Sequence, residues 1–438
     1  MIGSRNRFFD KSEHQQKVGL TMAGSIQPSS MSQKKMLMIV CDGLSDRPVK
    51  QFEMKTPLQV ARKPAMDALT RHGISGTMDV IGPGIVPGSD TAHLALFGYD
   101  PFKVYTGRGP IEAAGVGIEL GRTDVAFRCN FATANKSSIV TDRRAGRIKN
   151  GTSELAKAVS GMKIDGITAI FKEGSEHRGV LVLRGDDLDY RVTDVDPHQD
   201  GEILEARALV PSAKRTADAV NEFVKRSAEI LAEHPVNRDR VKSGLPPANV
   251  ILPRGAGNIG DLEPLPDRYG IRCAAVAGVT LVKGICKLVG MEVPVVQGAT
   301  GGLDTDYRAK GEAAVRLLDS FDFVFVNVKA GDVASHDGDF RMKVSVVENI
   351  DLMLGLILKD IGEDVVIALT CDHSTPISVR EHSADPVPLA ISGGGTRVDG
   401  VKEFDEVSVA SGALGRIKGM ELMPILLGSA DRATKFGA

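Results

Sequence analysis

Three short apolar segments, at residues 36–41, 321–328 and 365–370, each lead into acidic or histidine side chains. Each segment is nearly continuous in apolar residues, as a strand covered on both faces requires. Because ligands bind beyond the carboxyl ends of the strands in an open α/β sheet, we expect these side chains to meet at one edge. Aspartate and histidine together suit Mn²⁺, Zn²⁺ or Mg²⁺, and about six such groups suit two ions roughly 4 Å apart. The side chains are Asp42, Asp332, His336, Asp372, His373 and His382.

Each of these residues by itself also has a more ordinary explanation. An aspartate after a strand most often caps a helix or closes a turn, and a single histidine most often lies in a core or on the surface. Their joint occurrence at three strand ends favours a metal site, but the residues alone leave both explanations open.

A serine follows glycine in the turn Pro87-Gly88-Ser89, which leads into an apolar stretch at residues 94–97. This pattern is typical of a helix N-terminus. Ser89 is then either an N-cap residue or a nucleophile whose hydroxyl proton is lost to metal coordination. The spacing does not decide between the two.

Helical patterns at residues 307–318 and 343–358 lie between the apolar segments, which predicts an α/β sheet with helices on both faces. The middle of the chain differs in being rich in arginine and aspartate. It has a strand-like segment at 179–183, a long helical stretch at 213–233 and a polar segment at 237–248 that we interpret as a loop. Since the candidate ligands lie on both sides of this region, an inserted domain explains the order better than two domains in tandem.

Bulk composition describes an ordinary globular protein, with 438 residues, 42% hydrophobic and 25% charged residues, and a formal net charge of -2. The charge gives no indication of nucleic acid or an anionic membrane as a partner. The five cysteines are odd in number and form no C-x-x-C pair, which favours a reduced, cytoplasmic protein. No apolar stretch approaches the roughly 18 residues of a membrane span, and residues 1–33 have the composition of a disordered extension.

Four segments in order then make a specific resemblance: IVCDGLSDRP at 39–48, PGSDTAHL at 87–94, DVASHDGD at 332–339 and TCDHS at 370–374. Together they resemble the archaeal-type, 2,3-bisphosphoglycerate-independent phosphoglycerate mutases of the alkaline phosphatase superfamily. The resemblance extends from about residue 36 to the end of the chain.

The resemblance implies that Ser89 is phosphorylated transiently between two divalent ions, which would be Mn²⁺, Mg²⁺ or Zn²⁺. One ion would be held by Asp42, Ser89, Asp372 and His373, and the other by Asp332, His336 and His382. The insert would bind the rest of the substrate, with Asp142 as acid–base group. Arginine suits phosphate and carboxylate, although arginines on a charged loop are usually only solvated. The substrate contacts expected are Arg143, Arg144, Arg254 and Lys329.

The resemblance also implies an alkaline-phosphatase-like metal domain with a mostly parallel sheet, formed by residues 34–103 and 293–438, and an inserted α+β domain at 104–292. We expect interconversion of 3-phosphoglycerate and 2-phosphoglycerate, a step of glycolysis and gluconeogenesis. The alternatives are another phosphotransferase or phosphatase of the superfamily and, in a different class, a non-catalytic metal- or phosphometabolite-binding protein. Whether the chain forms a homo-oligomer stays open.

Overall fold

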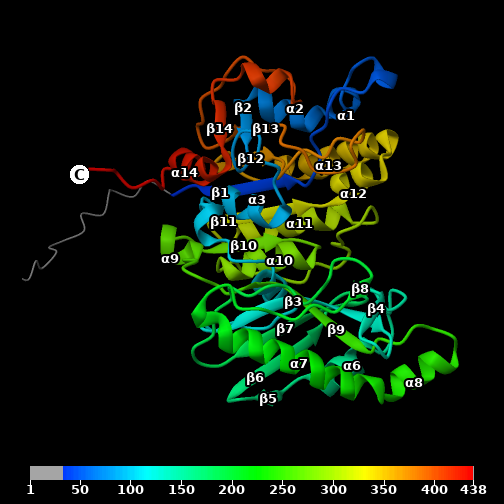
Figure 1. The fold of residues 1–438 in the computed structure, drawn as a ribbon. Coiled ribbons are helices and arrows are strands. Elements are labelled where there is room, and N and C mark those ends of the chain that lie inside the picture. The colour runs from blue at the N-terminus through cyan, green and yellow to red at the C-terminus, as the bar shows by residue number, and fades with distance from the viewer. Residues whose placement is uncertain (1–32, 438) are drawn as a thin grey trace, which may run out of the picture. The chain divides into compact units, whose positions relative to one another are not determined.

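The computed structural model describes residues 33–437, so the disordered extension predicted for residues 1–33 lies almost entirely outside the described residues. Residues 34–437 form one compact unit that contains two seven-stranded sheets (Figure 1). No helix in the described part of the chain combines the length and the apolar character needed to cross a membrane.

The first sheet has the order β10-β11-β1-β12-β13-β2-β14. All its strands run in one direction except β13, which is antiparallel to both of its neighbours. The three predicted strands are confirmed to within two residues and lie side by side, and all their residues except Lys35 are buried. The strands are β1 (Lys35–Cys41), β2 (Gly73–Asp79), β10 (Cys273–Val276), β11 (Phe323–Val328), β12 (Val365–Thr370), β13 (Val387–Ser392) and β14 (Gly415–Lys418).

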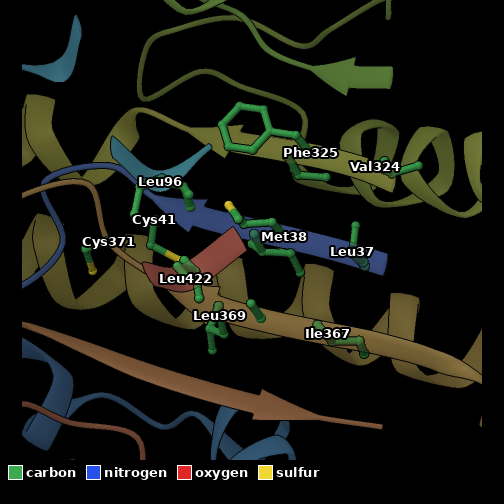
Figure 2. Packing of buried hydrophobic residues seen from close by; sticks show 14 of the residues in the cluster. Leu37, Met38, Cys41, Leu96, Val324, Phe325, Ile367, Leu369, Cys371 and Leu422 are labelled. Atoms are coloured by element: carbon green, nitrogen blue, oxygen red, sulfur yellow. The ribbon is translucent and has the colours of Figure 1, made fainter. Parts of the chain in front are cut away.

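Helices cover both faces of this sheet, as predicted. In one group, three helices pack against α13 (Phe340–Asp360), namely α1 (Pro57–Val60), α2 (Pro64–Arg71) and α11 (Tyr307–Leu318). A second group comprises α3 (Ser89–Leu96), α10 (Thr280–Leu288) and α14 (Gly419–Ser429). Figure 2 shows Leu96 of α3 and Leu422 of α14 beside Met38 of β1, in one apolar core with the central strands.

The second sheet is antiparallel, with the order β5-β6-β7-β3-β4-β8 and with β9 also paired to β3. Helices α6 (Thr152–Val159) and α7 (Lys214–Ala232) pack on it around a separate core, and α5 (Gly109–Gly115) packs against β3, β7 and β9. Its strands are β3 (Val125–Ala134), β4 (Ile139–Asp142), β5 (Met162–Ile164), β6 (Ile167–Glu173), β7 (Arg178–Arg184), β8 (Gly201–Glu202) and β9 (Val250–Gly257).

Two features of the middle region differ from the sequence interpretation. Residues 237–248 are not all loop, because α8 (Pro235–Lys242) begins with a proline at its first position and ends only at Lys242. Inside 104–292, β10 and α10 join the first sheet and its helices, whereas the second sheet ends with β9. The division into a metal domain and an insert at 104–292 stays a prediction.

Candidate metal and serine site

The carboxyl ends of β1, β11 and β12 bring the predicted ligands together. These strands are parallel neighbours in register, with Val40 of β1 opposite both Asn327 of β11 and Thr370 of β12. Chain segments leaving their ends therefore meet at one edge of the sheet. Asp42 directly follows β1, and Asp372 follows β12 after one residue. Asp332 and His336 lie on the short helix α12 (Ala330–Asp337) that follows β11.

Asp42, Asp372 and His373 form a first group, with one potential ligand atom from each residue within 4.8 Å of the others. All three side chains are completely buried. The Ser89 Oγ atom lies 3.2 Å from His373 Nε2, so the serine is placed beside this group. The Gly43 amide donates to Asp372 Oδ1 at 3.0 Å and thereby fixes the orientation of that carboxylate.

Asp332, His336 and His382 form a second group with the same spacing of ligand atoms. The Nε2 atoms of the two histidines lie 3.3 and 3.4 Å from Asp332 Oδ1. The His373 and His382 rings stack with centroids 3.6 Å apart, so the two groups adjoin each other. The structure thus brings all six predicted ligands and Ser89 together in two neighbouring groups.

Hydrogen bonds set the tautomer of every histidine in the two groups. His373 donates from Nδ1 to Thr375 Oγ1 at 2.9 Å. His336 and His382 donate from Nδ1 to the carbonyls of Arg380 and Pro87, respectively, each at 2.8 Å. The Nε2 lone pairs then face carboxylate oxygens, and two acceptors at such distances need a cation or a proton between them. Metal-binding histidines are held in this way.

The charges at the site also fit a cation. Burial and the charge of Asp372 raise the pKa of Asp42. Burial would also raise the pKa of Asp372, but the neighbouring His373 holds the pKa of that carboxyl well below its usual range. Asp372 Oδ2 is buried and receives no hydrogen bond from any residue that the structure describes. With the histidines neutral, three buried carboxylates and one lysine leave a net charge of about -2, which divalent ions would neutralise.

Lys329 lies between the two groups. Its Nζ atom is 2.8 Å from Asp42 Oδ1, 2.8 Å from Asp332 Oδ2 and 3.3 Å from Ser89 Oγ. Burial opposes its charge, but Asp42 and Asp332 outweigh burial and raise the pKa of the lysine. Lys329 therefore places a positive charge beside the serine.

Ser89 is the first residue of α3, and Gly88 is the N-cap, so the serine is not the capping residue. Sequence reasoning missed two residues that hold this helix. His93 Nδ1 donates to the Ser89 carbonyl at 2.6 Å, while Asn327 Nδ2 donates to His93 Nε2 at 3.3 Å and to Asp42 Oδ2 at 3.1 Å. Two features of the sequence could have indicated them: His93 lies four residues after the serine, and Asn327 is a polar residue inside an apolar strand.

The predicted insert residues form their hydrogen bonds and ion pairs within the middle region of the chain. Asp142 accepts hydrogen bonds from the backbone of its own loop, at Arg144 and Gly146, and the Arg144 side chain is exposed. Arg143 forms a bidentate pair with buried Asp196, at 2.9 and 2.6 Å. Arg254 approaches the same carboxylate at 3.4 Å. Within residues 33–437, no hydrogen bond or ion pair joins Asp142, Arg143, Arg144 or Arg254 to either group, and their roles stay predictions.

A methyl group at Gly43 should disturb this arrangement strongly. Gly43 has a φ of +62°, and a Cβ there would lie 2.6 Å from the Asp332 Cβ and 2.8 Å from Asp332 Oδ1. We expect Gly43→Ala to lower the free energy of unfolding by at least about 1 kcal/mol and to weaken metal binding by the second group. Denaturant unfolding and metal analysis measure the two effects. Gly362→Ala is the control, since its Cβ would meet no atom within 4 Å. Equal metal binding in both variants would contradict the prediction.

The predicted α/β fold, with a mostly parallel sheet and helices on both faces, is confirmed, and comparison with known proteins gives the class of the protein. A family model described as 2,3-bisphosphoglycerate-independent phosphoglycerate mutase matches residues 70–237. A protein of that name from Methanopyrus kandleri is 51% identical over 416 residues, which cover 93% of this chain and 99% of the relative. Another from Methanocaldococcus jannaschii, named 2,3-bisphosphoglycerate-independent phosphoglycerate mutase 1, is 49% identical over 413 residues, 93% of this chain and 100% of the relative.

Two solved structures are also similar to this chain in fold and in sequence over most of its length. The cofactor-independent phosphoglycerate mutase from Thermoplasma acidophilum has a TM-score of 0.73 and 40% identity, over 91% of this chain and 100% of the other. The PH0037 protein from Pyrococcus horikoshii has a TM-score of 0.82 and 40% identity, over 93% and 100%. This chain therefore belongs to the family of 2,3-bisphosphoglycerate-independent phosphoglycerate mutases, and it is an enzyme.

Proposed function

We propose that this enzyme interconverts 3-phosphoglycerate and 2-phosphoglycerate through a phosphoserine at Ser89. The observation that supports this most is the position of the Ser89 hydroxyl. It lies 3.2 Å from an imidazole of the first group and 3.3 Å from the Lys329 ammonium, which itself contacts Asp332 of the second group. A nucleophile between two sets of metal ligands is suited to phosphoryl transfer. The names of relatives close to half identical over nine-tenths of the chain support the choice of substrate.

The transfer takes place in two steps, in which the phosphoryl group first moves to the serine and then returns to the glycerate. Ser89 Oγ forms a bond to phosphorus as the bond between phosphorus and the glycerate oxygen breaks, and the proton lost by the serine is matched by the one that the departing oxygen gains. The free glycerate then offers its other hydroxyl, which takes the phosphoryl group back from Ser89. Asp142 remains the predicted group that moves protons on the glycerate hydroxyls.

Residues of this chain would position the reactants for both steps. His93 and Asn327 hold the start of α3, and with it Ser89, against Asp42. Lys329 offers its charge to the phosphoryl group beside the serine. The two ligand groups would hold divalent ions, which when bound lower the pKa of the serine hydroxyl and stabilise charge on the phosphoryl oxygens. The site must also exclude water while glycerate turns, because water would release phosphate instead.

A coupled assay tests the proposal directly. Purified enzyme is given 3-phosphoglycerate without added 2,3-bisphosphoglycerate, in the presence of Mn²⁺, Mg²⁺ or Zn²⁺, and enolase reports the 2-phosphoglycerate formed. Inorganic phosphate is measured in the same sample. We expect formation of 2-phosphoglycerate well in excess of phosphate with at least one metal. Phosphate release without isomerisation would show a phosphatase and overturn the proposal.

A further inference from the structure

One hydroxyl group joins the two ligand groups. Thr375 lies two residues after His373, and its Oγ1 atom is 2.9 Å from His373 Nδ1 in the first group and 3.1 Å from Asp332 Oδ1 in the second. The Thr375 side chain is completely buried. We propose that Thr375 is a positioning residue shared by both groups, which orients His373 and Asp332 for their ions through this one hydroxyl. The inference rests on the two-ion site of the proposed function.

The direction of both hydrogen bonds follows from the chemistry of the three side chains. A threonine hydroxyl carries a single proton, and an ionised carboxylate can only accept. Thr375 therefore donates to Asp332, and its oxygen accepts from the Nδ1–H group of His373. The carboxylate of the second group thus acts through Thr375 on the imidazole of the first. With a proton on Nδ1, the Nε2 lone pair of His373 is directed at the first group, where Asp372 Oδ2 lies 3.2 Å away.

His373 differs in this respect from the other two histidines of the site. His336 and His382 donate from Nδ1 to backbone carbonyl oxygens, which are present whatever the side chain at that position. His373 donates to a side chain instead. Its orientation therefore depends on the residue at position 375, and a single substitution there can remove the acceptor.

The backbone of Thr375 is held firmly, so its hydroxyl has a fixed position. The Thr375 amide donates to the Ser45 carbonyl at 3.1 Å, and the Thr375 carbonyl accepts from Lys343 Nζ at 3.0 Å. The other two protons of this completely buried ammonium group are directed at the Ser45 carbonyl, at 3.2 Å, and at Asp46 Oδ2, at 2.8 Å. All three donors of Lys343 are thus used, and they join the chain that follows β1 to the chain that follows β12.

Loss of the Thr375 hydroxyl should affect both groups because no bulk water can replace it. Thr375 and His373 are both completely buried, so the Nδ1–H group would be left without an acceptor, which is unfavourable. Asp332 would lose the donor at Oδ1 and keep the contact of Lys329 at Oδ2. Substitution of a histidine ligand should weaken one ion, whereas substitution of Thr375 should weaken both.

Titration of the protein with Mn²⁺ tests the inference. In Thr375→Val, whose side chain has almost the same shape, we expect the affinity for each of the two ions to fall roughly ten- to a hundredfold. Thr375→Ser keeps the hydroxyl and should retain most of the affinity for both. Thr375→Ala removes the same hydroxyl and should also weaken both ions, which keeps the test open if the valine variant does not fold.

Thr370→Val is the matched control. Thr370 is another completely buried threonine, at the end of β12, and its hydroxyl donates to the carbonyl oxygens of Pro388 and Cys371 and not to either ligand group. Its loss should lower stability and leave both ion affinities unchanged.

A second measurement observes the hydrogen bond itself. In protein loaded with diamagnetic Zn²⁺, the Nδ1 proton of His373 should give a downfield, slowly exchanging proton signal in the NMR spectrum of the wild type, Thr375→Ser and Thr370→Val. The signal should be missing from His373→Ala, which identifies it. In Thr375→Val it should move upfield and exchange faster, because its acceptor is gone. A purely structural role of Thr375 would leave it in place.

The outcomes separate this inference from the proposed function. If the wild type forms no 2-phosphoglycerate but binds two ions and shows these differences, the proposed function fails and the role of Thr375 stands. If the wild type is active and Thr375→Val binds both ions as tightly as Thr370→Val, or loses affinity for only one of them, Thr375 does not serve both groups. A wild-type protein that binds fewer than two ions would also overturn the inference, whatever its activity.

Discussion

Ser89→Ala should reduce phosphoglycerate mutase activity on the order of 10⁴-fold or more, since it removes the hydroxyl proposed to accept the phosphoryl group. The residues around Ser89 support so large an effect, because its Oγ is the hydroxyl that both His373 Nε2 and Lys329 Nζ approach. Metal content should change little, as three other protein ligands remain in each group. The coupled enolase assay and metal analysis of the same preparation measure both quantities.

A matched control lies on the same helix. Thr91→Val removes a hydroxyl whose hydrogen bonds, among the described residues, are to the backbone of Gly88, so it tests whether a disturbed start of α3 is enough to abolish activity. We expect this variant to lose some stability and to keep most of its activity. Phosphopeptide mapping of enzyme trapped during turnover should place phosphate on Ser89. Phosphate on another residue, or an alanine variant within tenfold of wild type, would refute the nucleophile assignment.

Metal removal should have the second large effect. Chelation should abolish activity and Mn²⁺ or a similar ion should restore it, because the Nε2 lone pairs and carboxylates of the two groups face one another and need a cation between them. The two groups should also be separable. His336→Ala should weaken binding of one ion at least about a hundredfold and leave the other, whereas His373→Ala should do the reverse.

The measurement is a titration of metal-free protein, with metal content determined after dialysis. His72→Ala is the control, since this exposed histidine at the end of α2 belongs to neither group. Full occupancy of both sites in His336→Ala would contradict the ligand assignment. Loss of both ions in every histidine variant would show that the groups bind metal as one unit and would overturn the division into two.

Much of the metal and serine site could be predicted from the sequence because it is encoded locally. Each central strand is a short apolar segment, and Asp42 and Asp372 follow β1 and β12 almost directly. A strand that must be buried on both faces belongs to the interior of the parallel sheet in an α/β fold. Its carboxyl end then lies at the edge where ligands bind. His382, nine residues beyond His373, lies furthest along the chain from its strand, and it was the family resemblance that assigned it to the second ion.

Tertiary structure alone decided the contacts of the middle region. Arg143 is paired with Asp196, 53 residues later in the chain, and Arg108, Arg128 and Arg178 come from three separate elements that meet at one cavity. The pairing of β10 with the first sheet is also long-range, since 46 residues of chain lie between its end and the start of β11. The apolar pattern of a strand indicates that the strand is buried and where it ends. The partner of an arginine depends instead on which carboxylate, distant in the chain, folding brings within about 3 Å of it.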